Sequence, residues 1–146
     1  MLVIDTNVLV YAADDAAREQ SACRRILEES HRGRTPWYLT WGIVYEFLRV
    51  VTHPRVLRQP REIAEAWSFV TALLASPSNG VLVATPLHEE VATHIVNDHR
   101  GILSGNLLYD AHTVTLMHEY GVSRIVTRDA DFHRFRGVEV VDPLSG

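Results

Sequence analysis

Four acidic residues of this chain stand where a soluble domain would ordinarily place an apolar side chain: Asp5, Glu46, Asp110 and Asp129. Asp5 and Asp129 follow short apolar runs, residues 2–4 and 125–127, that are typical of buried strands. Open α/β sheets assemble their sites just past the carboxyl ends of such strands. We therefore expect these two acids to meet at one edge of a sheet.

The other two acids lie inside helical patterns, on apolar stripes that are predicted to face inward. The stripe beside Glu46 is Ile43, Phe47 and Val50, and the stripe beside Asp110 is Leu107, Ala111 and Val114. An unpaired carboxylate on a core-facing stripe is costly. Because one divalent cation can serve several carboxylates at once, the four acids predict a metal site.

A metal held by carboxylates has a characteristic chemistry. Mg²⁺ takes oxygen ligands, keeps several waters, and commonly combines one or two carboxylates with phosphate oxygens of a substrate. It lowers the pKa of a bound water and neutralises charge on a phosphodiester under attack. The residues alone thus favour metal-dependent hydrolysis, with Glu46 as a ligand or as the group that orients the attacking water.

Length and composition are those of one globular domain. The chain has 146 residues, of which 47% are hydrophobic and 22% charged, and its apolar runs are too short for a transmembrane helix. The single cysteine cannot form an intramolecular disulfide, and the first residues lack the layout of a secretory signal. We therefore expect a cytoplasmic protein without a membrane segment.

Helical and strand patterns alternate along the chain. Strands are predicted over residues 2–4, 37–39, 81–84, 124–127 and 138–141, and helices over 14–30, 41–53, 60–74, 87–98 and 107–120, with Leu87 facing inward. This alternation predicts right-handed βαβ units. The expected fold class is α/β, a three-layer α/β/α sandwich around a mostly parallel sheet of four to five strands.

The charge pattern leaves the question of nucleic acid open. A net charge of -4 argues against phosphate binding, yet acids that hold a metal present a positive site once loaded. Basic residues also cluster on one stretch of the chain. The candidates for RNA contact are Arg24, Arg25, Arg32 and Arg34, and the alternative is an ordinary solvated helix face.

Four motifs in order resemble the PIN domain nucleases and, in this length class, the VapC toxins of toxin–antitoxin pairs. They are Asp-Thr-Asn at 5–7, a glutamate in a helix at 46, Leu-Leu-Tyr-Asp-Ala-His at 107–112, and Val-Thr-Arg-Asp-Ala-Asp-Phe at 126–132. The resemblance covers nearly the whole chain. It implies a single PIN domain over residues 1–146, with a PIN-like sandwich, and a Mg²⁺- or Mn²⁺-dependent endoribonuclease.

The resemblance also assigns residues. The family's metal-binding and catalytic acids fall on Asp5, Glu46, Asp110 and Asp129, with Asp131 as the alternative fourth acid. The polar residues around them fall on Thr6, Asn7 and Thr127. The hydroxyls of Thr6 and Thr127 are expected to hydrogen-bond the metal-binding carboxylates.

The implied function is that of a toxin that cleaves structured RNA, tRNA or rRNA, to arrest translation and growth. Its implied partners are a VapB-like antitoxin, whose tail crosses the acidic groove, and a second copy of the chain in a homodimer. Apolar residues around Val44, Leu48 and the helix over 63–74 are the predicted antitoxin-facing groove, since amphipathic helices dock in this way.

Other interpretations remain open. Asp5 or Asn7 could simply cap the next helix, and Asp129 could belong to a turn. A catalytically silent PIN-fold module that binds RNA or protein is the main alternative function, and a phospho-acceptor domain of flavodoxin-like topology is a third. The eight histidines lack the spacing of a zinc site. The complete set of acids favours the enzyme.

Overall fold

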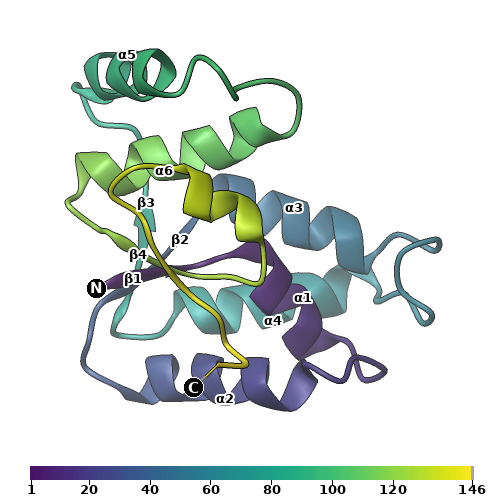
Figure 1. Cartoon of the computed structure of the whole chain (residues 1–146). Helices are drawn as coiled ribbons and strands as arrows, with labels where there is room; N and C mark the ends of the chain where they lie inside the picture. Colours follow the sequence, from purple (N-terminus) through teal and green to yellow (C-terminus); the bar gives the residue numbers. More distant parts are fainter. Residues whose placement is uncertain (146) are drawn as a thin grey trace.

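The computed structural model describes residues 1–145, and within them five strands form one parallel sheet (Figure 1). The strands are β1 (Leu2–Ile4), β2 (Trp37–Thr40), β3 (Asn79–Leu82), β4 (Arg124–Val126) and β5 (Glu139–Val141). Every pairing is parallel, in the order β3-β2-β1-β4-β5. The α/β class is confirmed, with a sheet that is wholly parallel.

The strand order reverses in the middle of the sheet. The chain winds outward from β1 through β2 to β3, and then returns to the other side of β1 with β4 and β5. Ligands of doubly wound sheets bind at such a reversal, outside the carboxyl ends of the two strands that flank it. Those two strands are β1 and β4, and they are followed by Asp5 and by the segment 127–131.

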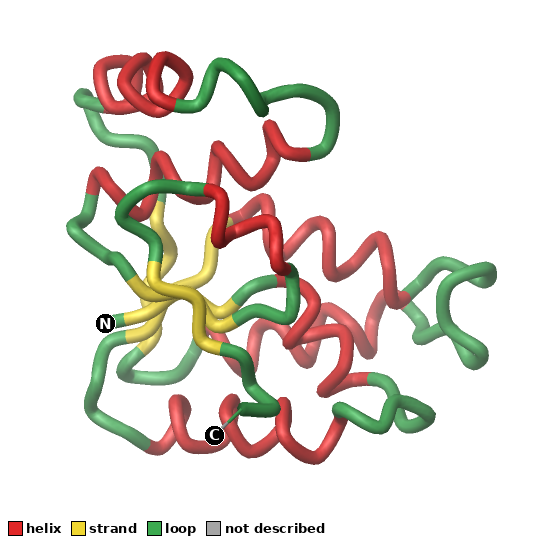
Figure 2. The backbone as a smooth tube through the Cα atoms, viewed as in Figure 1, coloured by secondary structure: helices red, strands yellow, loops and turns green. Residues whose placement is uncertain are grey.

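Helices cover both faces of the sheet (Figure 2). They are α1 (Thr6–Ala13), α2 (Gln20–Arg32), α3 (Trp41–Val51), α4 (Ile63–Leu74), α5 (His88–Asp98) and α6 (Leu107–Glu119), with a 3-10 helix, η1 (Ala130–Arg134). In Figure 1, α5 and α6 lie above the sheet, while α2 and α4 lie below it. The three-layer α/β/α sandwich is therefore confirmed.

Burial on both faces of the sheet explains why the central strands are apolar. Val3, Ile4, Leu39 and Ile125 are wholly inaccessible to solvent, as expected for parallel strands covered on both faces. Below the sheet, α1 packs against both α2 and α3. Among residues 1–145, no helix is both long and apolar enough to cross a membrane.

The first helix differs from the prediction. Residues 6–13 form α1, and the predicted helix over 14–30 begins only at Gln20. Two local hydrogen bonds account for this: the Asp5 carboxylate accepts from the backbone N–H of Thr6, and the Asp14 carboxylate accepts from that of Ala16. The first caps α1, and the second stabilises the turn between the two helices.

Two smaller differences concern the segment around β3. This strand covers Asn79–Leu82 rather than 81–84, because its pairing with β2 already starts at Asn79 opposite Trp37. The prediction that Leu87 faces inward is wrong, since its side chain is exposed. The hydroxyl of Thr85 accepts from the Leu87 N–H, and so α5 starts one residue later.

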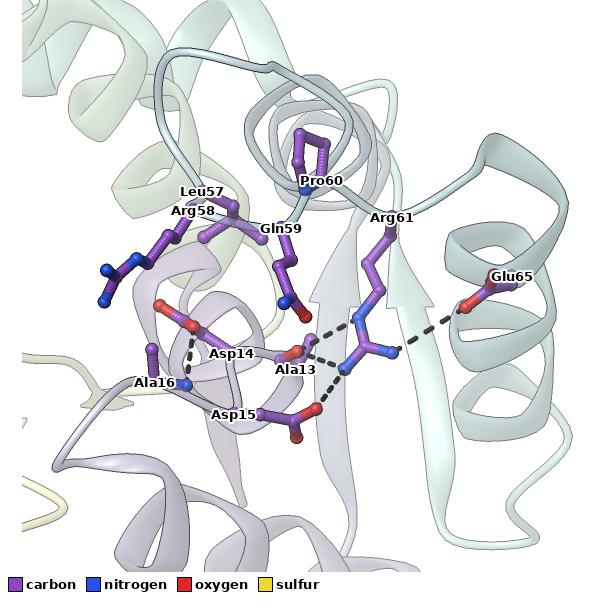
Figure 3. A pocket seen from close by; sticks show the side chains of 10 residues that line it. All are labelled: Ala13, Asp14, Asp15, Ala16, Leu57, Arg58, Gln59, Pro60, Arg61 and Glu65. Atoms are coloured by element: carbon purple, nitrogen blue, oxygen red, sulfur yellow. Dashed lines mark hydrogen bonds and ion pairs between the residues drawn. The ribbon is translucent and has the colours of Figure 1, made fainter.

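A pocket of about 580 Å³ lies where α1 ends (Figure 3). The guanidinium of Arg61 donates to the Ala13 carbonyl oxygen at 2.7 Å, and it also forms ion pairs with Asp15 at 3.5 Å and Glu65 at 3.7 Å. Arg61 therefore ties the end of α1 to the start of α4. None of the acids predicted to bind metal lines this pocket.

Candidate metal centre

Asp5 is held at the end of β1 by three donors. One carboxylate oxygen accepts from the backbone N–H of Thr6 at 2.8 Å. The other accepts from the hydroxyl of Thr127 at 2.8 Å and from the side-chain amide of Asn7 at 3.2 Å. Asp5 does cap α1, as the alternative interpretation held, but the donors from Asn7 and Thr127 show that capping is only part of its environment.

The Thr127 hydroxyl connects the two strand ends. It donates to Asp5 and accepts from the Asn7 amide at 2.9 Å and from the backbone N–H of Asp129 at 3.0 Å. One donor and two acceptor positions are all that a hydroxyl offers, so this group is fully used. Asn7 completes the connection, because its amide oxygen accepts from the Arg128 N–H at 3.0 Å.

Three further carboxylates converge beside this network. Asp110 from α6 and Asp129 and Asp131 from the β4–η1 turn each offer an oxygen, and these three atoms lie within 4.8 Å of one another. The Asp129 carboxylate also accepts from the backbone N–H of Asp131 at 2.9 Å. The sequence left a choice between Asp129 and Asp131 as the fourth acid, and the structure places both beside Asp110.

The electrostatic cost of this arrangement is visible at Asp5. Burial raises the pKa of Asp5 to about 6, even though the hydrogen bonds from Thr127 and Thr6 act in the opposite direction. The charges of Glu46 and Asp129 add to the rise. Asp5 is thus a partly buried carboxyl with other acids nearby, and none of the ion pairs among residues 1–145 involves it.

Asp110 is shifted further. Burial raises its pKa to about 7, and repulsion by neighbouring carboxylates adds to the shift. The neighbours, in order of effect, are Asp129, Asp5, Asp131 and Glu46. All the other acids named from the sequence are therefore close enough to repel Asp110, although they come from three separate parts of the chain.

Glu46 occupies a different position from the predicted one. The prediction that it faces inward is wrong, because its residue is exposed while Ile43 and Phe47 are buried. The buried stripe of α3 continues through Val44 and Leu48, and this leaves Glu46 on the flank that faces solvent. It still raises the pKa of Asp5, as described above, so it borders the cluster from the outside.

The predicted role of the Thr6 hydroxyl is wrong, whereas Arg24, a candidate for RNA contact, also makes a contact within the fold. The Thr6 hydroxyl does not contact a carboxylate but donates to the backbone oxygen of Ile43 at 3.5 Å, so Thr6 serves Asp5 through its N–H only. Arg24 donates to the Ala12 carbonyl oxygen at 2.9 Å and thereby fastens α2 to α1.

The remaining basic candidates for RNA contact lie far from the acids along the sheet. Arg32 ends α2 and Arg34 follows shortly before β2 begins, which places both at the amino-terminal edge of the strands. The acids follow the carboxyl ends. Arg25 is exposed on α2 between them. The structure therefore does not bring these arginines to the candidate site.

We expect Thr127→Val to weaken the site without unfolding the protein. Valine keeps the shape of the side chain, but Asp5 loses a donor that lowers its pKa, and two N–H groups lose their acceptor. Loss of such outer partners typically reduces metal affinity or activity about 10- to 100-fold. Calorimetric titration with Mn²⁺ should show weaker binding, and a pH titration of the metal-free variant by NMR should show a higher pKa of Asp5. If neither value changes, Thr127 does not support the site.

Comparisons with known proteins identify the family and the fold. The model of the PIN domain family matches residues 2–138. Ribonuclease VapC48 of Mycobacterium tuberculosis is 32% identical over 149 residues, which cover 97% of each chain. Ribonuclease VapC43 of the same organism is 34% identical over 146 residues, which cover 100% of this chain and 97% of the relative. A solved structure of VapBC2 from Rickettsia felis, bound to a DNA fragment from its promoter, has a TM-score of 0.68 at 14% identity and covers 96% of both chains, a likeness of fold.

Proposed function

The chain belongs to the PIN domain family and, within it, to the VapC ribonucleases, and from this premise we propose that it is the toxin of a type II toxin–antitoxin pair. Its activity is that of an endoribonuclease, which hydrolyses phosphodiester bonds of RNA. The finer proposal is that cleavage depends on Mg²⁺ or Mn²⁺. The substrate we propose is structured cellular RNA, tRNA or rRNA, whose loss arrests translation and growth.

The observation that carries the metal proposal is the donor set. Asp110, Asp129 and Asp131 offer three oxygens within 4.8 Å of one another, and the buried Asp5 adjoins them. Hard divalent cations prefer such all-oxygen sites. Carboxylates that raise each other's pKa also gain from a shared cation, because it removes their repulsion. The residues present therefore fit Mg²⁺ or Mn²⁺.

The protein side of the reaction follows from these positions. When bound, a divalent cation supplies a water of lowered pKa and neutralises charge on the phosphodiester. Asp5 is immobilised by Thr127 and Asn7, so its carboxylate is oriented before any ligand arrives. Asp110, with a pKa near 7, must lose its proton to act as a ligand. The proposed role of Glu46 is to bind the cation or to orient the attacking water, and its position at the border of the acids supports this.

The proposed partners are a VapB-like antitoxin and a second copy of the chain. The two curated relatives are ribonucleases named VapC, and the Rickettsia felis structure pairs such a chain with its VapB partner. We also propose a cytoplasmic location, because the proposed substrate, structured cellular RNA, is found there. Light scattering of the purified toxin tests the homodimer.

Part of the predicted antitoxin-facing groove is wrong. Val44 and Leu48 are buried in the core and are not available to a partner. The α4 part of the prediction remains a proposal, supported by a groove of about 340 Å³ between α2 and α4. Its walls include Leu27, Phe69 and Leu73, which suit the apolar face of an amphipathic helix.

Cleavage of RNA with and without chelator tests the proposed function. Purified protein should cleave total cellular RNA in millimolar Mn²⁺ or Mg²⁺, lose the activity in excess EDTA, and regain it when the metal is restored. A Ca²⁺ arm separates simple ion binding from catalysis. Cleavage that persists in EDTA would disprove the metal dependence, and RNA binding without any cleavage would point to the catalytically silent module.

A further inference from the structure

Arg134 is the basic residue that the structure brings to the acids. Among residues 1–145, it is the only arginine, lysine or histidine whose side chain forms an ion pair with one of the clustered carboxylates. Its Nη1 lies 3.6 Å from Oδ1 of Asp131, which belongs to the three-acid group. Sequence patterns had directed attention to arginines of α2 instead.

The ion pair between Arg134 and Asp131 is weak enough for another anion to replace Asp131 as the partner of Arg134. Arg134 and Asp131 lie one turn apart on η1, and their side chains are 48% and 53% exposed. A salt bridge at this exposure contributes little to stability, so the guanidinium is available to a stronger acceptor. Its backbone position is fixed nevertheless, since η1 is capped by Asp129 and anchored by the buried Phe132.

The side chains of neighbouring arginines form ion pairs with carboxylates outside the acidic cluster. Arg128, which is next to Asp129 in sequence, directs its guanidinium to Asp142 at 3.6 Å. Arg124 pairs with Glu139 at the start of β4, at the far edge of the sheet. Around the β4–η1 turn, the described structure therefore leaves Arg134 as the arginine that combines proximity to the acids with a weakly held side chain.

We propose that Arg134 binds a phosphate of the RNA backbone next to the phosphodiester that is cleaved. The proposal rests on the nuclease function argued above. A cation on the acids would neutralise Asp131 and weaken its hold on Arg134. A phosphate then offers two oxygens in the planar, bidentate geometry that a guanidinium matches best. Arg134 thus passes from a carboxylate partner in the free protein to a phosphate partner in the complex.

Binding of RNA, measured apart from cleavage, tests this proposal. The probe is a fluorescent single-stranded RNA of mixed sequence, titrated in Mn²⁺ with protein that carries Glu46→Gln, which suppresses cleavage but leaves Asp5 and the three-acid group in place. In this background we compare Arg134→Ala, Arg134→Lys and the matched control Arg34→Ala, which removes the same charge at the opposite edge of the sheet. Each affinity is measured over a series of salt concentrations.

Arg134→Ala should weaken binding about tenfold, the lower end of what a hydrogen bond between charged groups contributes. The slope of log K against log salt should become shallower by about 0.7, as expected for one lost contact to a single strand. Arg134→Lys should keep the slope but recover only part of the affinity. Arg34→Ala should change neither. Equal behaviour of Arg134→Ala and Arg34→Ala would overturn the proposal.

A second measurement separates phosphate binding from support of the acids. Without RNA, Arg134→Ala should bind Mn²⁺ as tightly as the unmodified chain or slightly more tightly, because a competing cation has been removed from Asp131. Weaker Mn²⁺ binding would mean that Arg134 positions the acids, and it would overturn the proposal. Failure of the unmodified chain to cleave RNA would instead refute the nuclease function, while the binding series would still decide the role of Arg134.

Discussion

Asp110→Asn is expected to abolish RNA cleavage and the growth arrest caused by expression, while the protein stays folded. Asparagine has nearly the same shape as aspartate but lacks the charge that holds a cation. Asp110 stands at the centre of the acids, since four other carboxylates act on its pKa. Loss of its charge should lower the cleavage rate at least about 100-fold, which corresponds to about 2.7 kcal/mol of barrier.

Asp5→Asn should have the same effect on cleavage. Asparagine caps a helix about as well as aspartate, so α1 keeps its start. Circular dichroism and thermal melts of both variants provide the control for folding. Full activity in either folded variant would contradict the assignment of these acids to a metal site.

The same assay decides between the two acids of the β4–η1 turn. Asp129→Asn and Asp131→Asn each remove one carboxylate of the three-acid group. We expect the greater loss at Asp129, because Asp131 is more exposed and already has a cation partner in Arg134. A greater loss at Asp131 would reverse the assignment of the fourth ligand.

The metal-free protein is expected to lose stability as the pH rises from about 4 to about 7. Asp5 and Asp110 have folded-state pKa values of about 6 and about 7, above their ordinary value of 3.8. A group with a raised folded pKa binds more protons in the folded state, so its stabilising effect is complete below pH 3.8 and is lost as the pH passes the folded pKa. For the buried Asp5, this amounts to about 3 kcal/mol at about 1.4 kcal/mol per pH unit.

A different carboxyl limits stability at low pH. Burial alone would raise the pKa of Glu119, but hydrogen bonds from Thr85 and His88 outweigh it and hold the pKa below its usual range. The stability that Glu119 contributes is therefore present above pH 4.5 and lost as the pH falls through its folded pKa. Thermal melts in EDTA should accordingly show a maximum at about pH 4, between the gain from Glu119 and the losses from Asp5 and Asp110.

Mn²⁺ should remove the loss of stability at neutral pH. A ligand at a hundredfold excess over its Kd stabilises by about 2.7 kcal/mol, which is several degrees in a melt of a protein of this size. Asp110→Asn should raise the metal-free melting temperature at pH 8 and flatten the response to Mn²⁺. If the unmodified protein melts identically in EDTA and in millimolar Mn²⁺, and Asp110→Asn is simply less stable, these acids are structural.

The sequence predicts the sheet better than the faces of the helices. The strand signal is strong because parallel strands are buried on both sides, so residues 2–4 and the pair 125–126 are unbroken apolar runs. Glu46 shows the limit of the helical pattern. Three apolar neighbours predicted that its side chain faces inward. The buried face of α3 also includes Val44 and Leu48, so its centre is rotated by about one residue, away from Glu46. A single residue on a helix is a rotation of 100°, enough to move a side chain to solvent.

Other features depend on contacts that no local pattern contains. The strand order sets β1 beside β4 and brings Asp5 to Asp129, although 124 positions separate them. The short helix α1 has no amphipathic period of its own and is recognisable only from its cap. Arg134 was missed because the signal sought was a cluster of basic residues, whereas its interest lies in one ion pair with Asp131.

The strand order also determines when, during synthesis, the acidic site can form. Asp5 is synthesised first, but β4 and the turn that carries Asp129 and Asp131 are among the last segments to leave the ribosome. Until β4 inserts beside β1, the Asp5 carboxylate lacks Thr127, and the three-acid group does not exist. We therefore expect the growing chain to gain its site only after residues 127–131 have joined β1, and a fragment that ends before residue 127 to lack the site.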